Sequence, residues 1–179
     1  VKTPEYLTDQ LGKETVKFIE TNKDKPFFIY LAYNAVHSPL QATDEDLKSL
    51  EHITNKKRRI LGAMTIALDR SIGYVLDSLK KQGLEENTIV VFSNDNGAAT
   101  YLKTNNGGLR GRKGTVWEGG LRVPYCASWK GHIKPGTVCD TPVNTLDVAY
   151  TFCKQAGYYG ADFSKMKLAG SDLLELAAG

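Results

Sequence analysis

The sequence predicts an α/β fold, a three-layer sandwich in which helices cover both faces of a central sheet. Two short apolar runs rich in β-branched or aromatic residues, 27–33 and 88–92, have the length of buried strands. Segments with helical periodicity precede, separate and follow these runs. Strands that alternate with helices favour a mostly parallel or mixed sheet, although the strand order does not follow from the sequence.

The composition is that of an ordinary globular protein. The 179 residues are 41% hydrophobic and 24% charged, which is enough for a core, and we expect a single domain over 1–179. The sequence contains no run of about 18 apolar residues, so no membrane span is predicted, and its first residues do not have the pattern of a signal peptide. Three cysteines fit neither a zinc site nor a disulfide framework. We expect Cys126 and Cys153 in the core, with Cys139 as a candidate for exposure.

The first third of the chain has the signals of a helix, a strand and a second helix. Thr8 is a candidate N-cap for a helix over 8–22, which Lys25-Pro26 ends. The run 27–33 follows as a central strand, because Pro is tolerated at the first position of a strand. Thr43 then caps a short helix with acids in its first turn.

A long helix is predicted after a break near Asn55, and Gly83 suits the left-handed conformation that ends it. Its apolar residues recur every third or fourth position: Leu61, Met64, Leu68, Ile72, Val75 and Leu79. Further signals predict a strand over 122–129, a turn at Pro135-Gly136 and a helix from Thr145 to Gly157. The signals after Gly157 are weaker.

Asp95 and Asn96 follow the strand over 88–92 at its C-terminal end, where ligands collect in open α/β sheets. A carboxylate and an amide carbonyl are hard oxygen donors that Ca²⁺ or Mg²⁺ prefers. Gly97 allows the backbone to turn away sharply. The same tripeptide is also a common turn, so these residues alone leave both a metal site and a simple turn open.

A basic, Gly-rich loop comes next. The net charge of the whole chain is only +3, whereas the stretch from 101 to 135 has seven cationic side chains against Glu118: Lys103, Arg110, Arg112, Lys113, Arg122, Lys130 and Lys134. Backbone N–H groups together with Arg110, Arg112 and Lys113 can surround an oxyanion such as sulfate or phosphate. A solvated basic loop is the alternative. Nucleic acid is not favoured, since no aromatic platform or DNA-binding motif accompanies the charges.

His37 lies in the loop after the first predicted strand. There an imidazole can donate to an anion or act as a general acid, although a lone loop histidine is more often simply exposed. His52 and His132 belong to no motif, and we expect both at the surface.

Three strings, PFFIYLAYNAVHSPLQ, TIVVFSNDNG and LRGRKGTVWEGGLRVP, resemble the sulfatase family of the alkaline phosphatase superfamily when taken in this order. The resemblance is closest to the arylsulfatase B type, which includes N-acetylgalactosamine 4-sulfatases, and runs from about Leu7 to Leu176. It implies an alkaline phosphatase-like fold and hydrolysis of a sulfate ester of a sulfated sugar or aryl group. It also implies a full-length protein that is periplasmic, secreted or lysosomal.

The resemblance implies a role for each matching residue. Asp95 and Asn96 would ligate Ca²⁺, or Mg²⁺; Lys113 would bind the sulfate, and His37 would protonate the leaving oxygen. The family's nucleophile is a formylglycine made from a Cys or Ser in a C/S-x-P/A-S-R motif. Arg110 and Arg112 would contact the substrate, while Glu118 is expected to stabilise the loop by pairing with an Arg.

The sequence lacks two parts of the family pattern, the nucleophile motif and several N-terminal site residues. Cys126-Ala127-Ser128-Trp129-Lys130 only superficially resembles the nucleophile motif, and the family's N-terminal aspartate pair, Arg, first Lys and first His are not found. We therefore expect the C-terminal part of a catalytic domain. Two alternatives remain open, a catalytically silent anion- or glycan-binding module and a phosphoester hydrolase of the same superfamily. The sequence does not indicate the oligomeric state.

Overall fold

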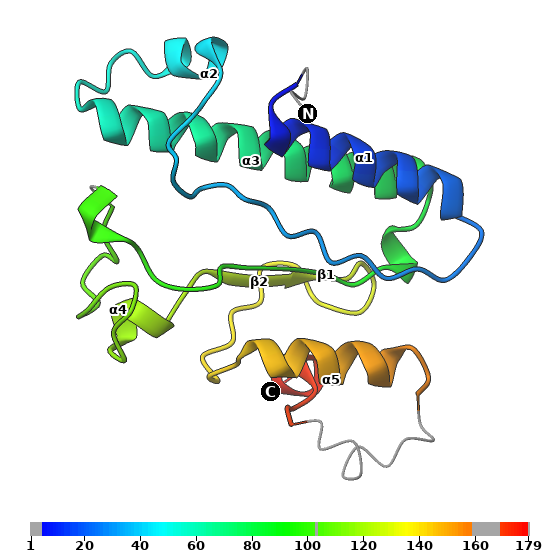
Figure 1. Cartoon of the computed structure of the whole chain (residues 1–179). Helices are drawn as coiled ribbons and strands as arrows, with labels where there is room; N and C mark the ends of the chain where they lie inside the picture. The colour runs from blue at the N-terminus through cyan, green and yellow to red at the C-terminus, as the bar shows by residue number, and fades with distance from the viewer. Residues whose placement is uncertain (1–4, 103, 159–168, 179) are drawn as a thin grey trace. The chain divides into compact units, whose positions relative to one another are not determined.

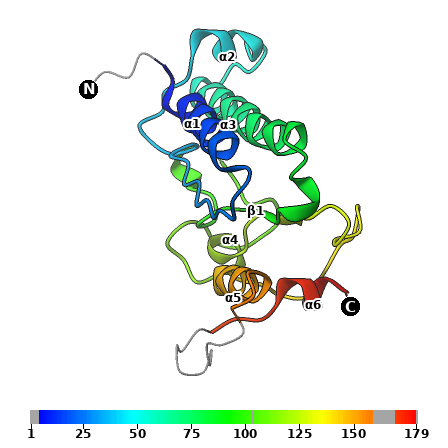
Figure 2. The ribbon, with the colours of Figure 1, turned by 90° about the vertical axis from the view of Figure 1, so that its right-hand side faces the viewer.

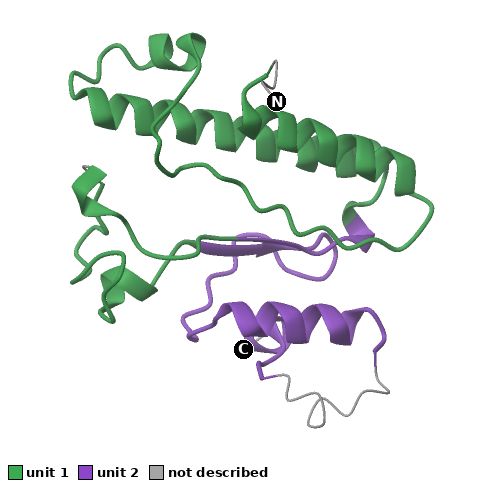
Figure 3. Ribbon diagram, viewed as in Figure 1, with its two compact units in different colours: residues 1–85, 93–124 green, residues 86–92, 125–179 purple. Residues whose placement is uncertain are grey.

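The computed structural model describes residues 5–102, 104–158 and 169–178, so Lys103 and much of the segment after Gly157 lie outside the described residues. The chain forms two compact units, one of residues 1–85 and 93–124 and the other of 86–92 and 125–179 (Figure 3). The elements in order are α1 (Leu7–Asn22), α2 (Asp44–Ser49), α3 (Lys56–Lys81), η1 (Glu85–Asn87), β1 (Val90–Ser93), η2 (Thr100–Leu102), α4 (Glu118–Leu121), β2 (Tyr125–Ser128), α5 (Thr145–Gln155) and α6 (Leu173–Ala178).

The core of the first unit is the contact between α1 and α3, which run side by side, with α2 packed on α3 (Figures 1 and 2). The buried face of α3 contains Ala63, Ala67 and Ser71, small residues spaced four apart. Opposite them a Cβ on Gly12 would lie only 2.2 Å from Ser71 Oγ. The helices therefore approach closely because their contact residues are small. The larger predicted residues Leu68, Ile72 and Val75 are only half-buried.

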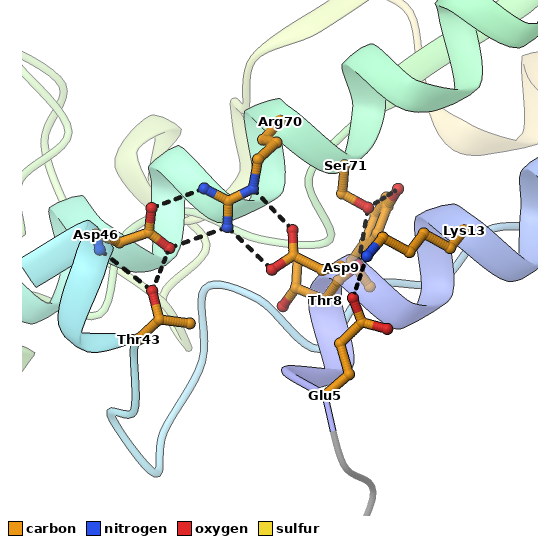
Figure 4. Close-up of polar contacts among 9 residues, drawn as sticks. Glu5, Thr8, Asp9, Lys13, Thr43, Asp46, Arg70 and Ser71 are labelled. Atoms are coloured by element: carbon orange, nitrogen blue, oxygen red, sulfur yellow. Dashed lines mark hydrogen bonds and ion pairs between the residues drawn. The ribbon is translucent and has the colours of Figure 1, made fainter.

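A buried ion network joins the three helices. Figure 4 shows the Arg70 guanidinium between the carboxylates of Asp9 and Asp46, at 2.9 Å from Nε to Asp9 Oδ1 and 2.7 Å from Nη1 to Asp46 Oδ1. Thr43 caps α2 and also donates to Asp46 at 2.8 Å. The hydrogen bonds from Arg70 lower the pKa of Asp46 below its usual value. This network fixes α2 and the start of α1 against the middle of α3.

The network predicts acid sensitivity. A carboxylate whose folded pKa is depressed stabilises the protein above its unfolded pKa of about 3.9, and this contribution is lost as the pH falls toward the folded pKa. We expect the free energy of unfolding, measured in urea, to fall more steeply between about pH 5 and pH 3 in the wild type than in Asp46→Asn. Asp44→Asn, an exposed acid of the same helix, is the control and should keep the wild-type slope. Equal slopes in all three proteins would contradict the prediction.

The prediction of a strand over 27–33 was wrong, because these residues are extended but form no strand. Residues 26–34 do alternate, with Phe28 69% and Tyr30 84% exposed while Phe27 and Ile29 are half-buried. The half-buried side faces the helices, through an edge contact of Phe27 with Phe18 at 6.2 Å and a 3.0 Å hydrogen bond between the Tyr33 and Ser71 hydroxyls. A strand also needs a neighbouring strand, and among the described residues the sheet consists of β1 and β2.

Most helix predictions are confirmed, with changes at their ends. Thr8 does not cap α1, which begins one residue earlier, and Thr8 is buried within it. Asn55 caps α3 through a bond from the Arg58 N–H, and Gly83 has the expected positive φ of 69°. The helix predicted from Thr145 is α5, which begins at that residue and is capped by Asn144 in a capping box with Asp147.

The second unit contains the two-stranded sheet of β1 and β2, with Ser93, the last residue of β1, belonging to the first unit. Its helices α5 and α6 are tied by Lys154, which lies 2.9 Å from Asp172 and 2.6 Å from Glu175. Both strands are shorter than predicted.

The prediction of core cysteines was wrong. Cys126 is exposed, because the two-stranded sheet leaves alternate residues of β2 uncovered, and Cys153 in α5 is half-buried. Cys139 is exposed, as are His52 and His132. Within the described ranges, no helix has both the length and the apolar character that a membrane span requires.

Candidate sulfate-binding site

The basic loop that carries Lys113, residues 105–122, belongs to the first unit, and backbone hydrogen bonds tie it to the residues after β1. The Lys113 N–H donates to the carbonyl of Ala98 at 3.0 Å, and the Gly97 N–H donates to the carbonyl of Gly120 at 3.0 Å. The Gly119 N–H donates to the carbonyl of Arg110 at 2.7 Å. The loop is therefore fixed at its middle and at its end, although it contains little regular secondary structure.

Three buried glycines allow this close approach. A Cβ on Gly97 would lie 1.9 Å from the carbonyl oxygen of Gly119, and one on Gly120 would lie 2.1 Å from that of Thr115. The sequence suggested that Gly97 serves a sharp turn, but its φ is not among the positive values found in the chain. Gly97 is needed because another backbone segment contacts it, which is a tertiary requirement.

The structure brings His37 and Lys113 into contact although they are 76 positions apart, with Lys113 Nζ 3.4 Å from His37 Nε2. Lys113 is half-buried and His37 is exposed. Thr115 closes a turn around Lys113, since its hydroxyl accepts the Arg112 N–H at 3.0 Å and donates to the Arg112 carbonyl at 2.8 Å. A cation and an imidazole therefore lie together at an accessible surface.

The hydrogen bonds of His37 define its tautomer. Nδ1 lies 2.9 Å from the carbonyl oxygen of Ser38, and because a carbonyl oxygen can only accept, Nδ1 carries the hydrogen. In the neutral ring Nε2 then holds the lone pair that accepts from the Lys113 ammonium. This nitrogen is the one that can take up and deliver a proton at the site.

Asp95 and Asn96 lie just before Ala98, whose carbonyl holds Lys113. Asp95 is exposed, and Asn96 donates its Nδ2 to the carbonyl of Gly97 at 3.1 Å, which leaves the amide oxygen Oδ1 as its ligand atom. The pair fits a hard cation in the type of its donors but supplies only two of the six to eight oxygens that Ca²⁺ takes. No group of three or more His, Cys, Asp or Glu side chains that could hold a metal occurs in the part of the chain that the structure describes.

The arginines of the loop differ in how they are held. The Arg110 guanidinium lies 3.7 Å above the ring of Trp117, which restricts its position, and Arg112 is exposed. Glu118 pairs with Arg122 at 3.5 Å, as expected for a residue that stabilises the loop, although both side chains are about two-thirds exposed and the pair contributes little.

Two residues of this site were missed by sequence reasoning. Trp117 supports Arg110, and Asn106 joins two backbone segments of the loop through its side chain. Asn106-Gly107 is visible in the sequence as a turn signal, but the partners of the side chain are not.

Comparison with known proteins decides the family of the chain, since the family model named Sulfatase matches residues 1–158. The chain belongs to the sulfatase family. Arylsulfatase J of Mus musculus is 42% identical over 143 residues, covering 79% of this chain and 24% of that protein. A sulfatase of Formosa agariphila is 38% identical over 172 residues, covering 87% and 31%.

The sulfatase fold is also confirmed by a solved structure. The crystal structure of Ps i-CgsB in complex with k-i-k-neocarrahexaose superposes with a TM-score of 0.91 at 40% identity, covering 98% of this chain and 39% of that chain. The expected alkaline phosphatase-like α/β class is therefore confirmed. In all three comparisons the chain spans less than half the length of the relative.

Proposed function

We propose that the complete protein containing this chain is a sulfuric ester hydrolase, and that the chain supplies its sulfate-binding lysine and its general acid. The observation that carries the proposal is the contact of Lys113 with His37 within a sulfatase-family chain. A lysine alone would be a common surface feature. A half-buried lysine on a hydrogen-bonded loop, against the one imidazole of the sulfatase motif, is a group suited to a tetrahedral anion and its leaving oxygen.

The chain's residues perform two tasks in the proposed reaction. Lys113 binds a nonbridging sulfate oxygen and stabilises charge on the transferring group. In its imidazolium form His37 carries a hydrogen on each ring nitrogen. It donates the one on Nε2 to the bridging oxygen as the bond from that oxygen to sulfur breaks, so that the sugar or aryl group leaves as a neutral alcohol or phenol and the ring returns to the neutral form with its hydrogen on Nδ1. The oxygen that replaces it on sulfur comes, over the complete cycle, from water.

A metal ion and a formylglycine complete the proposed site. Asp95 and the amide oxygen of Asn96 would provide two ligands to Ca²⁺ or Mg²⁺, and the remaining ligands would come from outside this pair. The formylglycine supplies the nucleophile, and we propose that it lies in a part of the protein outside this chain.

We further propose a sulfated sugar or aryl sulfate as the substrate. Arg110, held above Trp117, and Arg112 extend the positive charge beyond Lys113 and would contact the substrate next to the ester. A sulfated sugar is consistent with the neocarrahexaose bound by Ps i-CgsB.

The function is tested by comparing the 179-residue chain with the complete protein, produced with its formylglycine matured, on a chromogenic aryl sulfate. We expect turnover only by the complete protein, because Lys113 and His37 can bind and protonate but neither can attack sulfur. Without a nucleophile the rate should fall by several orders of magnitude, as it does when a central member of a catalytic unit is removed.

Two results would contradict the proposal. Turnover by the chain alone that vanishes in Lys113→Ala would show a self-contained site. A complete, matured protein that binds sulfated ligands but hydrolyses neither an aryl sulfate nor sulfated oligosaccharides would instead support a silent binding module.

A further inference from the structure

Asn106 lies in the basic loop with its side-chain amide between two separate backbone segments. Its Oδ1 accepts the N–H of Ala98 at 2.7 Å, and its Nδ2 donates to the carbonyl of Gly111 at 3.0 Å. The residue is half-buried, and both polar ends of the planar amide are satisfied by backbone groups. One side chain therefore holds two segments that would otherwise be joined only through the loop itself.

These two segments are the ones that carry the candidate site. Ala98 comes two residues after Asn96, and Gly111 comes two residues before Lys113. Both backbone polar groups of Ala98 are hydrogen-bonded. Its N–H donates to Asn106 Oδ1, and its carbonyl accepts the N–H of Lys113 at 3.0 Å. The hydrogen bonds thus close a ring through Ala98, Asn106, Gly111 and Lys113.

We propose that Asn106 is a positioning residue for Lys113, which fixes the lysine relative to Asp95 and Asn96 without touching the substrate. The inference rests on the proposed function only in taking Lys113 as the sulfate-binding group. The physical reason is that a loop without regular structure has no ladder to fix its register, so a side-chain amide replaces the missing backbone bonds. A preorganised cation binds an anion more tightly than a mobile one, because less conformational entropy is lost on binding.

The neighbouring Asn105 provides a matched control. It has the same side chain, but it is exposed, and its Oδ1 accepts the N–H of Gly107, two residues away, at 3.0 Å. That bond is a local turn and joins no distant segments. The two adjacent asparagines have the same side chain, and the structure shows that only Asn106 joins the two segments.

The experiment compares the full 179-residue chain with its Asn106→Asp, Asn106→Ser and Asn105→Asp variants. Aspartate at 106 can still accept the Ala98 N–H, but it loses the donor to Gly111 and places a carboxylate oxygen against that carbonyl. Serine is too short to reach both partners. Asn105→Asp adds the same negative charge to the loop while leaving the ring of hydrogen bonds intact.

The first readout is backbone hydrogen exchange. In Asn106→Asp we expect the Lys113 amide to exchange about tenfold faster while the Ala98 amide stays protected; in Asn106→Ser both should exchange faster. Asn105→Asp should match the wild type at both amides. General loosening of the loop would instead accelerate both amides equally in Asn106→Asp, and this result, or unchanged exchange at Lys113, would overturn the proposal.

The second readout is the dissociation constant for inorganic sulfate, measured by titration. We expect it to rise about tenfold in both Asn106 variants and to change less in Asn105→Asp. Equal affinity in the wild type and the Asn106 variants would overturn the positioning role. A wild-type chain that binds no sulfate would count against Lys113 as the sulfate-binding group, while the exchange data would still decide whether Asn106 holds the loop.

Discussion

Replacement of Lys113 by alanine in the complete, matured protein is expected to lower kcat/KM for an aryl sulfate by about a hundred- to a thousandfold. The ammonium group is held by the loop and lies 3.4 Å from His37 Nε2, so it is in place before the substrate arrives. Charge on the sulfate oxygens and on the leaving oxygen redistributes as the ester bond breaks. We therefore expect most of the loss in kcat rather than in KM.

The control for this variant is Lys134→Ala, which removes an exposed lysine of the same basic stretch outside the loop and should keep the wild-type rate. His37→Gln adds a second test. If His37 protonates the leaving oxygen, the loss should be much larger for a sulfated sugar, which leaves as a poor alkoxide, than for nitrophenyl sulfate. Lys113→Ala activity within about twofold of the wild type would exclude the proposed role of the lysine.

The largest effect on stability is expected from Arg70→Met, which should lower the free energy of unfolding by about 3 kcal/mol. Arg70 is the cation of the network in Figure 4, and the side chains of Asp9 and Asp46 beside it are only 12% and 4% exposed. Removing the cation leaves two carboxylates near each other with little access to water. Total stabilities of domains are about 5–15 kcal/mol, so this is a large share.

Two further measurements separate the loss of the charge network from a simple packing defect. Adding Asp9→Asn and Asp46→Asn to Arg70→Met should recover part of the lost stability, because it removes the uncompensated charges. The deficit of Arg70→Met should also shrink as the pH is lowered, since protonation neutralises the same carboxylates. Arg58→Met, at an exposed position of α3, should be near neutral. A pH-independent deficit without recovery would show that packing alone is involved.

The sequence predicted the helices well because their signals are local. The periodicity of α3, the Thr43 cap of α2 and the Gly83 stop each depend on residues within a few positions of one another. The segment 27–33 also has a local strand signal, yet no strand forms there. A strand must pair with a second strand, and the local pattern does not predict which segment that would be. The same reason explains Cys126, whose burial depended on a cover for β2.

The candidate site divides in the same way. The sequence by itself determined the family, and it named four candidate site residues, His37, Asp95, Asn96 and Lys113, because residue type and order are enough to match them to the family's motifs. Only the tertiary structure decided that Lys113 meets His37, that Gly97 is required for contact with Gly119, and that Asn106 rather than Asn105 holds the loop. These are contacts between residues distant in sequence or between identical neighbours. Their energies depend on distances that exist only once the chain has folded, so no local pattern contains them.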